Sequence, residues 1–103
     1  MITFNELLER ANTEKLVVHT PTEKEAKILL KMLDKRGFVW NSKKKLTSKN
    51  YYEEYRENTS YDFSRDYYRN ILDKKVVYGS LEFHQDEGYT IIEFNDIDFK
   101  ENK

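Results

Sequence analysis

The sequence contains no cysteine, one proline and three glycines in 103 residues, and each scarcity excludes a class of structure. Without cysteine, the chain forms neither a disulfide nor a thiolate zinc site. Three glycines are too few for phosphate-cradling loops, and no serine nucleophile elbow or metalloprotease helix motif is present. The longest apolar runs span a few residues, far short of a membrane helix. These absences predict a soluble, non-catalytic protein with no metal, no cofactor and no membrane contact.

Charge and aromatic rings are abundant instead: 36% of the residues are charged and 15% are aromatic. Disordered chains are poor in aromatics, so we expect residues 1–103 to fold as one domain whose core is built largely from rings. The net charge of −1 argues against a generally basic nucleic-acid binder. However, residues 35–49 carry six basic residues and no acid, whereas residues 82–101 carry seven acids and one lysine. This asymmetry predicts two faces of opposite potential, although solvated loops and helix ends would leave the same pattern.

Capping signals predict two helices. Thr3 and Glu6 are spaced as a capping box that starts a helix over residues 3–11, within an N-terminal addition of residues 1–14. A second helix is expected to be capped by Thr20 and to end at Gly37. Apolar residues repeat at the helical period in this second helix: Ala26, Leu29, Leu30 and Leu33.

Short runs of β-branched and aromatic residues predict strands between and after these helices. The runs cover residues 15–19, 38–40, 59–63, 76–80 and 89–94. Shorter helices are expected from Asn50, from Ser64 through residue 72, and over residues 81–87 before Gly88. The acidic tail, residues 95–103, either frays or forms an edge strand. The sequence therefore predicts one α+β domain with a three- to five-stranded, mainly antiparallel sheet and helices packed against it.

The stretch "NSKKKLTSKNYYEEYRENTSYDF" holds the candidate site. Basic residues of the loop and of the segment after it form the expected partner-binding surface: Lys43, Lys44, Lys45, Lys49 and Arg65. The alternative surface is aromatic: Trp40, Tyr51, Tyr52 and Tyr55. Glutamates lie among the tyrosines and would repel a nucleic-acid backbone. The tyrosines also share one helical face, so we expect them to pack into the core.

Three phrases together resemble small accessory proteins encoded by phages and other mobile elements of Gram-positive bacteria. They are "VVHTPTEKEAKILLKMLDKRGFVWNS", "YYEEYRENTSYDF" and "VVYGSLEFHQDEGYTIIEF", and the likeness spans about residues 15–94. Several such proteins are anti-CRISPR proteins that inhibit Cas9 of type II-A systems, and others sequester nucleotide signals of bacterial immunity. This sequence departs from the simplest pattern by its N-terminal helix over residues 3–11 and by the insertion "SRDYYRNILDKK".

The resemblance implies a non-catalytic inhibitor of bacterial immunity that works in the cytoplasm of the bacterial host. The partner that it implies is type II-A Cas9 with its guide RNA, and a homodimer is compatible with it. Two alternatives stay open: a sponge for a nucleotide immune signal, which would need an aromatic and basic pocket, and a small nucleic-acid-binding accessory protein. Direct nucleic-acid contact is the less favoured hypothesis. The net charge is −1, and the glutamates among the tyrosines would repel phosphates.

Overall fold

The N-terminal segment forms a short strand and a helix. The computed structural model, which describes residues 1–64 and 73–100, places β1 at Ile2–Thr3 and α1 at Phe4–Ala11. The Thr3 hydroxyl accepts a hydrogen bond from the Glu6 N–H, and the Glu6 carboxylate accepts one from the Thr3 N–H, at 3.1 and 3.0 Å. The predicted capping box is therefore confirmed. Phe4 and Leu7 are buried in the same core as the apolar face of the second helix, so the N-terminal addition is part of the domain's packing.

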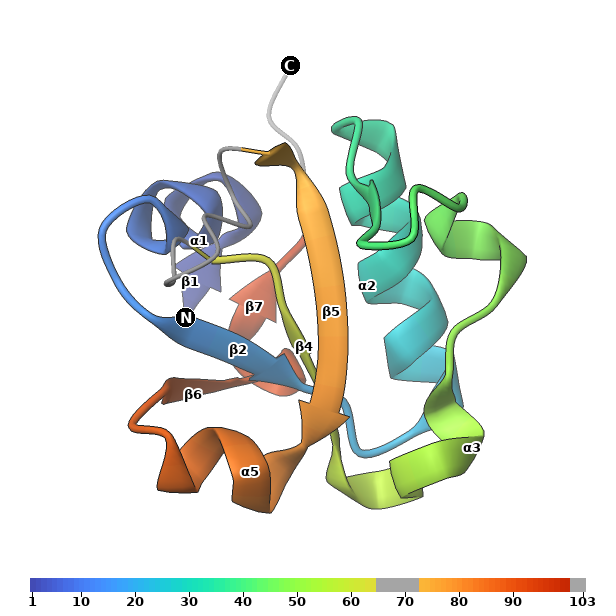
Figure 1. Cartoon of the computed structure of the whole chain (residues 1–103). Helices are drawn as coiled ribbons and strands as arrows, with labels where there is room; N and C mark the ends of the chain where they lie inside the picture. Colours follow the sequence, from blue (N-terminus) through green and yellow to red (C-terminus); the bar gives the residue numbers. More distant parts are fainter. Residues whose placement is uncertain (65–72, 101–103) are drawn as a thin grey trace.

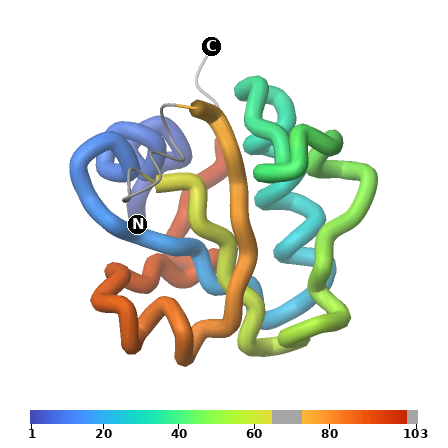
Figure 2. The backbone as a smooth tube through the Cα atoms, viewed as in Figure 1, coloured from blue at the N-terminus to red at the C-terminus, as the bar shows by residue number. Residues whose placement is uncertain are grey.

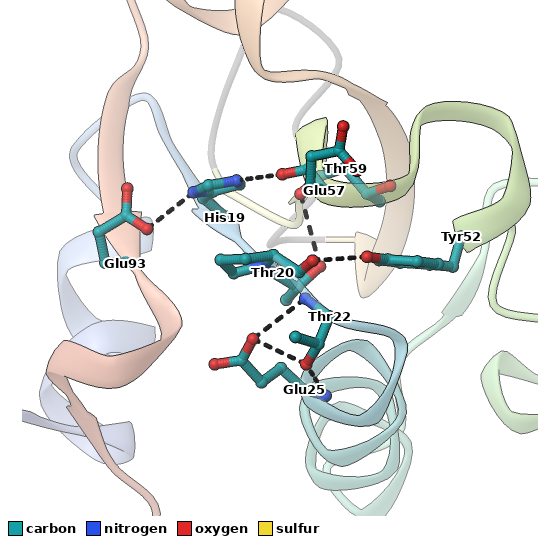
Figure 3. Close-up of polar contacts among 9 residues, drawn as sticks. His19, Thr20, Thr22, Glu25, Tyr52, Glu57, Thr59 and Glu93 are labelled. Atoms are coloured by element: carbon teal, nitrogen blue, oxygen red, sulfur yellow. Dashed lines mark hydrogen bonds and ion pairs between the residues drawn. The ribbon is translucent and has the colours of Figure 1, made fainter.

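The second helix, α2, spans Glu23–Lys35 and begins later than the sequence suggested. Its N-cap is Thr22 and the partner of Thr22 in the capping box is Glu25, so the cap predicted at Thr20 is wrong (Figure 3). Thr20 is buried, and its N–H donates to the carbonyl of Thr59 at 3.0 Å. Because Thr20 still takes part in strand pairing, the chain turns into the helix only after it.

The C-terminal end of α2 follows the prediction. Gly37 lies in the left-handed region with φ of 87°, and its N–H donates to the Asp34 carbonyl at 3.0 Å. The Phe38 N–H donates to the Leu33 carbonyl at 3.1 Å, which completes a Schellman motif. The predicted apolar stripe of α2 is buried: Ala26, Leu29, Leu30 and Leu33.

Five strands form the main sheet, in the spatial order β3-β5-β4-β2-β6. Figure 1 labels four of them: β5, β4, β2 and β6. Their bounds are β2 Leu16–His19, β3 Val39–Trp40, β4 Thr59–Asp62, β5 Lys75–Ser80 and β6 Thr90–Glu93. The inner pairs β2·β4 and β4·β5 are antiparallel, whereas the outer pairs β2·β6 and β3·β5 are parallel. The α+β class is confirmed. Two pairs of each kind make an evenly mixed sheet, whereas a mainly antiparallel sheet was expected. The reason is that α2 carries the chain from β2 to the far edge of the sheet, so that two strands lie between β2 and β3.

A second, two-stranded sheet joins the two ends of the chain. β1 pairs in parallel with β7, Ile97–Asp98, so that Ile2 lies opposite Ile97. Ile97 is buried, and the ring of Phe99 lies 5.4 Å from that of Phe4. Of the two expectations for the acidic tail, the edge strand is therefore correct for residues 97–98. Residues 101–103 lie outside the described part of the chain.

Short helical turns complete the fold. They are η1 Leu46–Ser48, α3 Tyr52–Tyr55, η2 Arg56–Asn58, α5 Leu81–Asp86 and η3 Phe94–Asp96. Ser80 caps α5 through the Phe83 N–H, and Gly88 follows it with φ of 80°. Figures 1 and 2 place α2 with the segment of residues 41–58 on one side of β5, and α1 with β1 and β7 on the other. The helix expected through residue 72 lies outside the described residues.

Aromatic rings supply much of the core, as the composition predicted. Phe38, Trp40, Tyr61 and Phe63 are all buried in one cluster with the leucines of α1 and α2. On β6 the buried residue is Ile92, whereas Ile91 is only partly covered. Among the residues that the structure describes, no helix is long and apolar enough to span a membrane.

Candidate functional site

The three consecutive lysines occupy a tight turn that folds back along β3. The Trp40 N–H donates to the Lys44 carbonyl at 2.9 Å, the Lys43 N–H donates to the Trp40 carbonyl at 2.7 Å, and Val39 forms an antiparallel bridge with Lys45. The side chains of residues 43–45 are all exposed. The turn therefore covers the backbone of an edge strand and presents three positive charges to solvent, as the sequence predicted.

The segment after this turn is fixed to the core at several points. The side chain of Leu46 is fully buried. The indole N–H of Trp40 donates to the Lys49 carbonyl at 2.9 Å, and the Tyr61 hydroxyl donates to the Asn50 carbonyl. Buried rings thus hold the backbone of this loop, and a loop that is held in place before binding loses less entropy when a partner binds.

A cluster of tyrosine rings adjoins the lysine turn. Tyr51 and Tyr78 stack with their centroids 4.5 Å apart and their planes 7° from parallel, and Tyr55 lies 6.1 Å from Tyr78. The Lys49 ammonium lies 4.9 Å from the centroid of the Tyr51 ring, which is within cation–π range. Lys49 therefore connects the tyrosine rings to the loop that carries the lysine turn. We call these residues the lysine–tyrosine face: Lys43, Lys44, Lys45, Lys49, Tyr51, Tyr55 and Tyr78.

The prediction that the tyrosines form a core helix is wrong for Tyr55, whose side chain is 37% exposed. The reason is that α3 has only four residues and is flanked by Tyr51, with φ of 58°, and Arg56, with φ of 51°. Spacing by three or four residues therefore does not define one face here. Tyr51 and Tyr52 are half-buried, and the Tyr52 hydroxyl donates to the carbonyl of Pro21 beside the start of α2 (Figure 3).

Trp40 belonged to the alternative, aromatic surface, and the structure buries it. Its side chain is 3% exposed and lies edge-on beneath Tyr51, with the ring centroids 4.9 Å apart. Trp40 therefore supports the lysine–tyrosine face from below and offers no open ring to a partner. Arg65, the remaining predicted contact, lies outside the described residues.

Backbone strain is concentrated at this face. Among the described residues, four that are not glycine have positive φ: Lys43, Tyr51, Arg56 and Lys74. Three of the four lie in the lysine–tyrosine face or next to it. Such conformations cost of the order of 1–3 kcal/mol each and tend to cluster at functional sites, where the surrounding structure holds them in place.

The structure adds Tyr78, which sequence analysis assigned only to a strand. Tyr78 reaches this face because β5 pairs with β3, which brings it beside Trp40 and Tyr51. Its hydroxyl donates to the carboxylate of Glu54, and this bond, followed by burial, raises the pKa of Tyr78 to about 12. No local sequence signal identifies the residue, since only the pairing of two distant strands places it here.

A shallow pocket of about 270 Å³ lies between the lysine turn and the tyrosines. Its lining combines two polar residues that precede the three lysines with apolar and aromatic ones: Asn41, Ser42, Trp40, Tyr51, Val76, Val77 and Tyr78. The pocket thus combines ring edges, an amide and a hydroxyl with positive charge nearby. Glu53 and Glu57 are exposed a few residues away, and the Glu54 carboxylate accepts the hydrogen bond of Tyr78, so negative charge borders the tyrosines on the side of α3.

Of the two histidines, His19 lies in β2 and His84 lies in α5. The Nδ1 of His84 lies 2.5 Å from the hydroxyl oxygen of Ser60, and both side chains are buried, so a substrate has no access to the serine. His19 lies between the Glu93 carboxylate and the Glu57 carbonyl, at 2.7 and 2.6 Å, and ties β2 to β6 and η2 (Figure 3). Within residues 1–64 and 73–100, no group of three or more metal-ligating side chains converges.

Comparisons with known proteins add no assignment to this geometry. No protein-family model matches the chain, and neither the search of curated proteins nor that of solved structures found a match.

Proposed function

We propose that the protein acts by binding a partner, without catalysing a reaction, and that the lysine–tyrosine face is the contact surface. The observation that carries the proposal is the fixed lysine turn beside half-buried and exposed tyrosines, with strained backbone at Lys43, Tyr51 and Arg56. Tyrosine at an interface supplies large contact area at low entropic cost, and exposed lysines steer a negatively charged partner into place.

The proposed partner is type II-A Cas9 with its guide RNA, in the cytoplasm of a bacterial host. This part of the proposal is supported by the resemblance of residues 15–94 to accessory proteins of phages and mobile elements. A standard interface needs about 800 Å² from each partner. The chain exposes 6438 Å² in total, so a single face is large enough. Inhibition would follow if the bound protein blocks DNA access to the nuclease.

Co-purification and a cleavage assay test this function. The protein is mixed with guide-loaded Cas9 from several type II-A systems, the complex is isolated by size exclusion, and cleavage of a matched DNA target is measured. We expect a stable complex and reduced cleavage with at least one of these nucleases. Full cleavage and no complex across all of them would refute the assignment of Cas9.

The pocket beside Tyr51 and Tyr78 favours a second candidate function, a sponge that sequesters a nucleotide immune signal. A nucleobase would contact the ring edges, and the nearby lysines would neutralise its phosphates. Calorimetry against a panel of cyclic nucleotides, with Tyr51→Ala as the comparison, tests this function. If the parent binds a cyclic nucleotide with measurable heat and Tyr51→Ala does not, the sponge function is supported. If the parent gives no heat with any cyclic nucleotide, the sponge function is rejected.

A further inference from the structure

A groove runs between α2 and the 3₁₀ turn η1, next to the lysine–tyrosine face. Its volume is about 440 Å³. Leu30 and Leu46, which are almost fully buried, line its base. Lys27 and Lys31 line it from α2, and Lys49 lines it from the loop. The groove is therefore a hollow with an apolar floor and three cationic side chains, two of which sequence analysis did not single out.

The spacing of these lysines follows from the helix. Lys27 and Lys31 are four residues apart on α2, so they point to the same side about 6 Å apart along the axis. The one acid that lines the groove is Glu23, whose carboxylate accepts a hydrogen bond from the Asn50 side-chain amide at 2.9 Å. Positive charge therefore exceeds negative charge along the groove by three to one.

Hydroxyl groups add donors to this positive potential. Thr47 and Ser48 lie in η1 and line the same groove. The Ser48 hydroxyl donates to the Lys45 carbonyl at 2.6 Å. Thr47 is exposed, and its hydroxyl makes no hydrogen bond to another of the described residues that line the groove. Lysine ammonium and neutral hydroxyl groups are typical partners of phosphate oxygens.

Lys49 connects the groove to the lysine–tyrosine face. The residue lines the groove, and its ammonium group lies over the ring of Tyr51. The lysine turn of residues 43–45 directly precedes η1, and Figures 1 and 2 show this part of the chain beside α2. The basic residues thus form a band that is longer than a single pocket.

We propose that this groove holds the phosphodiester backbone of a nucleic-acid strand, and that this strand is the part of the partner that the band contacts. The inference rests on the proposed function, because the proposed partner contains both protein and RNA. It says that the nucleic acid is the component that contacts α2 and η1. Lysine ammonium groups act as mobile point charges and are established phosphate binders. Positive charges that repeat along one groove complement the phosphates of a nucleic-acid strand, because the strand carries the same charge at every position.

Fluorescence anisotropy with a labelled oligouridine tests the proposal, with the matching deoxyoligonucleotide as a second probe. The variant Lys27→Glu/Lys31→Glu should bind on the order of tenfold more weakly at about 0.1 M salt. Its slope of log affinity against log salt should fall by about 1.4, because each phosphate contact on a single strand contributes about 0.7. Equal losses on the two probes would support contacts to phosphate, which both probes carry. A loss confined to the ribose probe would assign the lysines to the 2′-hydroxyl and would overturn the proposal of a backbone contact.

The matched control is Lys24→Glu/Lys35→Glu, which makes the same charge change on the same helix outside the groove. Both residues are exposed, and neither lines the groove. We expect this control to keep most of the affinity. A loss equal to that of the groove variant would overturn the proposal, because the binding would then depend on net charge alone. A melting curve of each variant checks that the fold is intact.

The same variants separate this inference from the proposed function. Oligonucleotide binding through the groove without any inhibition of Cas9 would reject the function and keep the inference. If the groove variant still inhibits Cas9 and the parent protein binds no oligonucleotide, the function is kept and the inference is rejected. A third outcome is that the protein binds RNA-free nuclease and no oligonucleotide, and that Lys27→Glu/Lys31→Glu weakens the binding to the nuclease. This outcome would assign the groove to an acidic protein surface and overturn the proposal.

Discussion

The indole N–H of Trp40 donates to the backbone carbonyl of Lys49 at 2.9 Å, so a buried ring holds the loop that carries the candidate site. We expect Trp40→Phe to lower the free energy of unfolding by about 1–3 kcal/mol, because it removes this bond and leaves space in the core. Urea denaturation followed by circular dichroism measures the change. A variant as stable as the parent would show that Trp40 does not hold the loop.

The packing of α2 is tested by two substitutions on the same helix. Leu30→Ala should cost about 2–5 kcal/mol, since the side chain is almost fully buried. Ile28→Ala is the control, and because Ile28 is 39% exposed, it should change stability far less. If both variants unfold at the same urea concentration, the buried face of α2 has been assigned wrongly.

Charge reversal of the lysine turn should separate binding from folding. Lys43→Glu, Lys44→Glu and Lys45→Glu together change the charge by six units at exposed positions, so stability should change little. Binding to guide-loaded Cas9 should weaken mainly through a slower association rate, with an effect that shrinks as salt rises. Surface plasmon resonance at two salt concentrations measures this. An unchanged association rate would remove the turn from the contact surface.

Two tyrosines of α3 should respond differently to truncation. Tyr52→Ala should lower stability, because the ring is half-buried and its hydroxyl donates to the Pro21 carbonyl. Tyr55→Ala should leave the melting temperature nearly unchanged and weaken partner binding, because its ring is more than a third exposed. A melting curve and a binding titration of each variant decide the matter. A large loss of stability in Tyr55→Ala alone would return that ring to the core.

Tyr78 should make stability depend on pH in the alkaline range. Its pKa is raised to about 12 in the folded protein, first by the hydrogen bond to Glu54, while an unfolded tyrosine ionises near 10. The folded state thus binds the proton more tightly, and the contribution of this group to stability is lost as pH rises from about 10 to about 12. Tyr78→Phe should show a shallower decline over this range in urea titrations. If the parent and Tyr78→Phe lose stability equally over this pH range, the hydrogen bond between Tyr78 and Glu54 is contradicted.

Local sequence determined most of the helices. Thr3 and Glu6 form their capping box, and Gly37 closes α2 in the left-handed conformation that its position indicated. These features involve residues close together in the chain, so short-range physical chemistry decides them. The start of α2 was misplaced by two residues because Thr20 has a partner in β4, and a local signal contains nothing about that partner.

The candidate site followed from the sequence only in part. Exposed lysines could be predicted, since a polar loop with one buried leucine is readily recognised, and residues 43–45 are exposed in the structure. The tyrosines could not be placed, because Tyr51 and Arg56 adopt positive φ and interrupt the helical spacing on which the prediction depended.

The sequence by itself thus determined the class of the fold, the capping box of α1, the end of α2 and the exposure of the lysine turn. The caps and the turn depend on neighbours within a few positions. Only the tertiary structure decided that β3 pairs with β5, which brings Tyr78 onto Tyr51, and that α2 lies against η1, which places Lys27 and Lys31 beside Lys49. These contacts join residues about 20 or more positions apart in the chain. Burial of one shared core selects such contacts, and no local pattern specifies them.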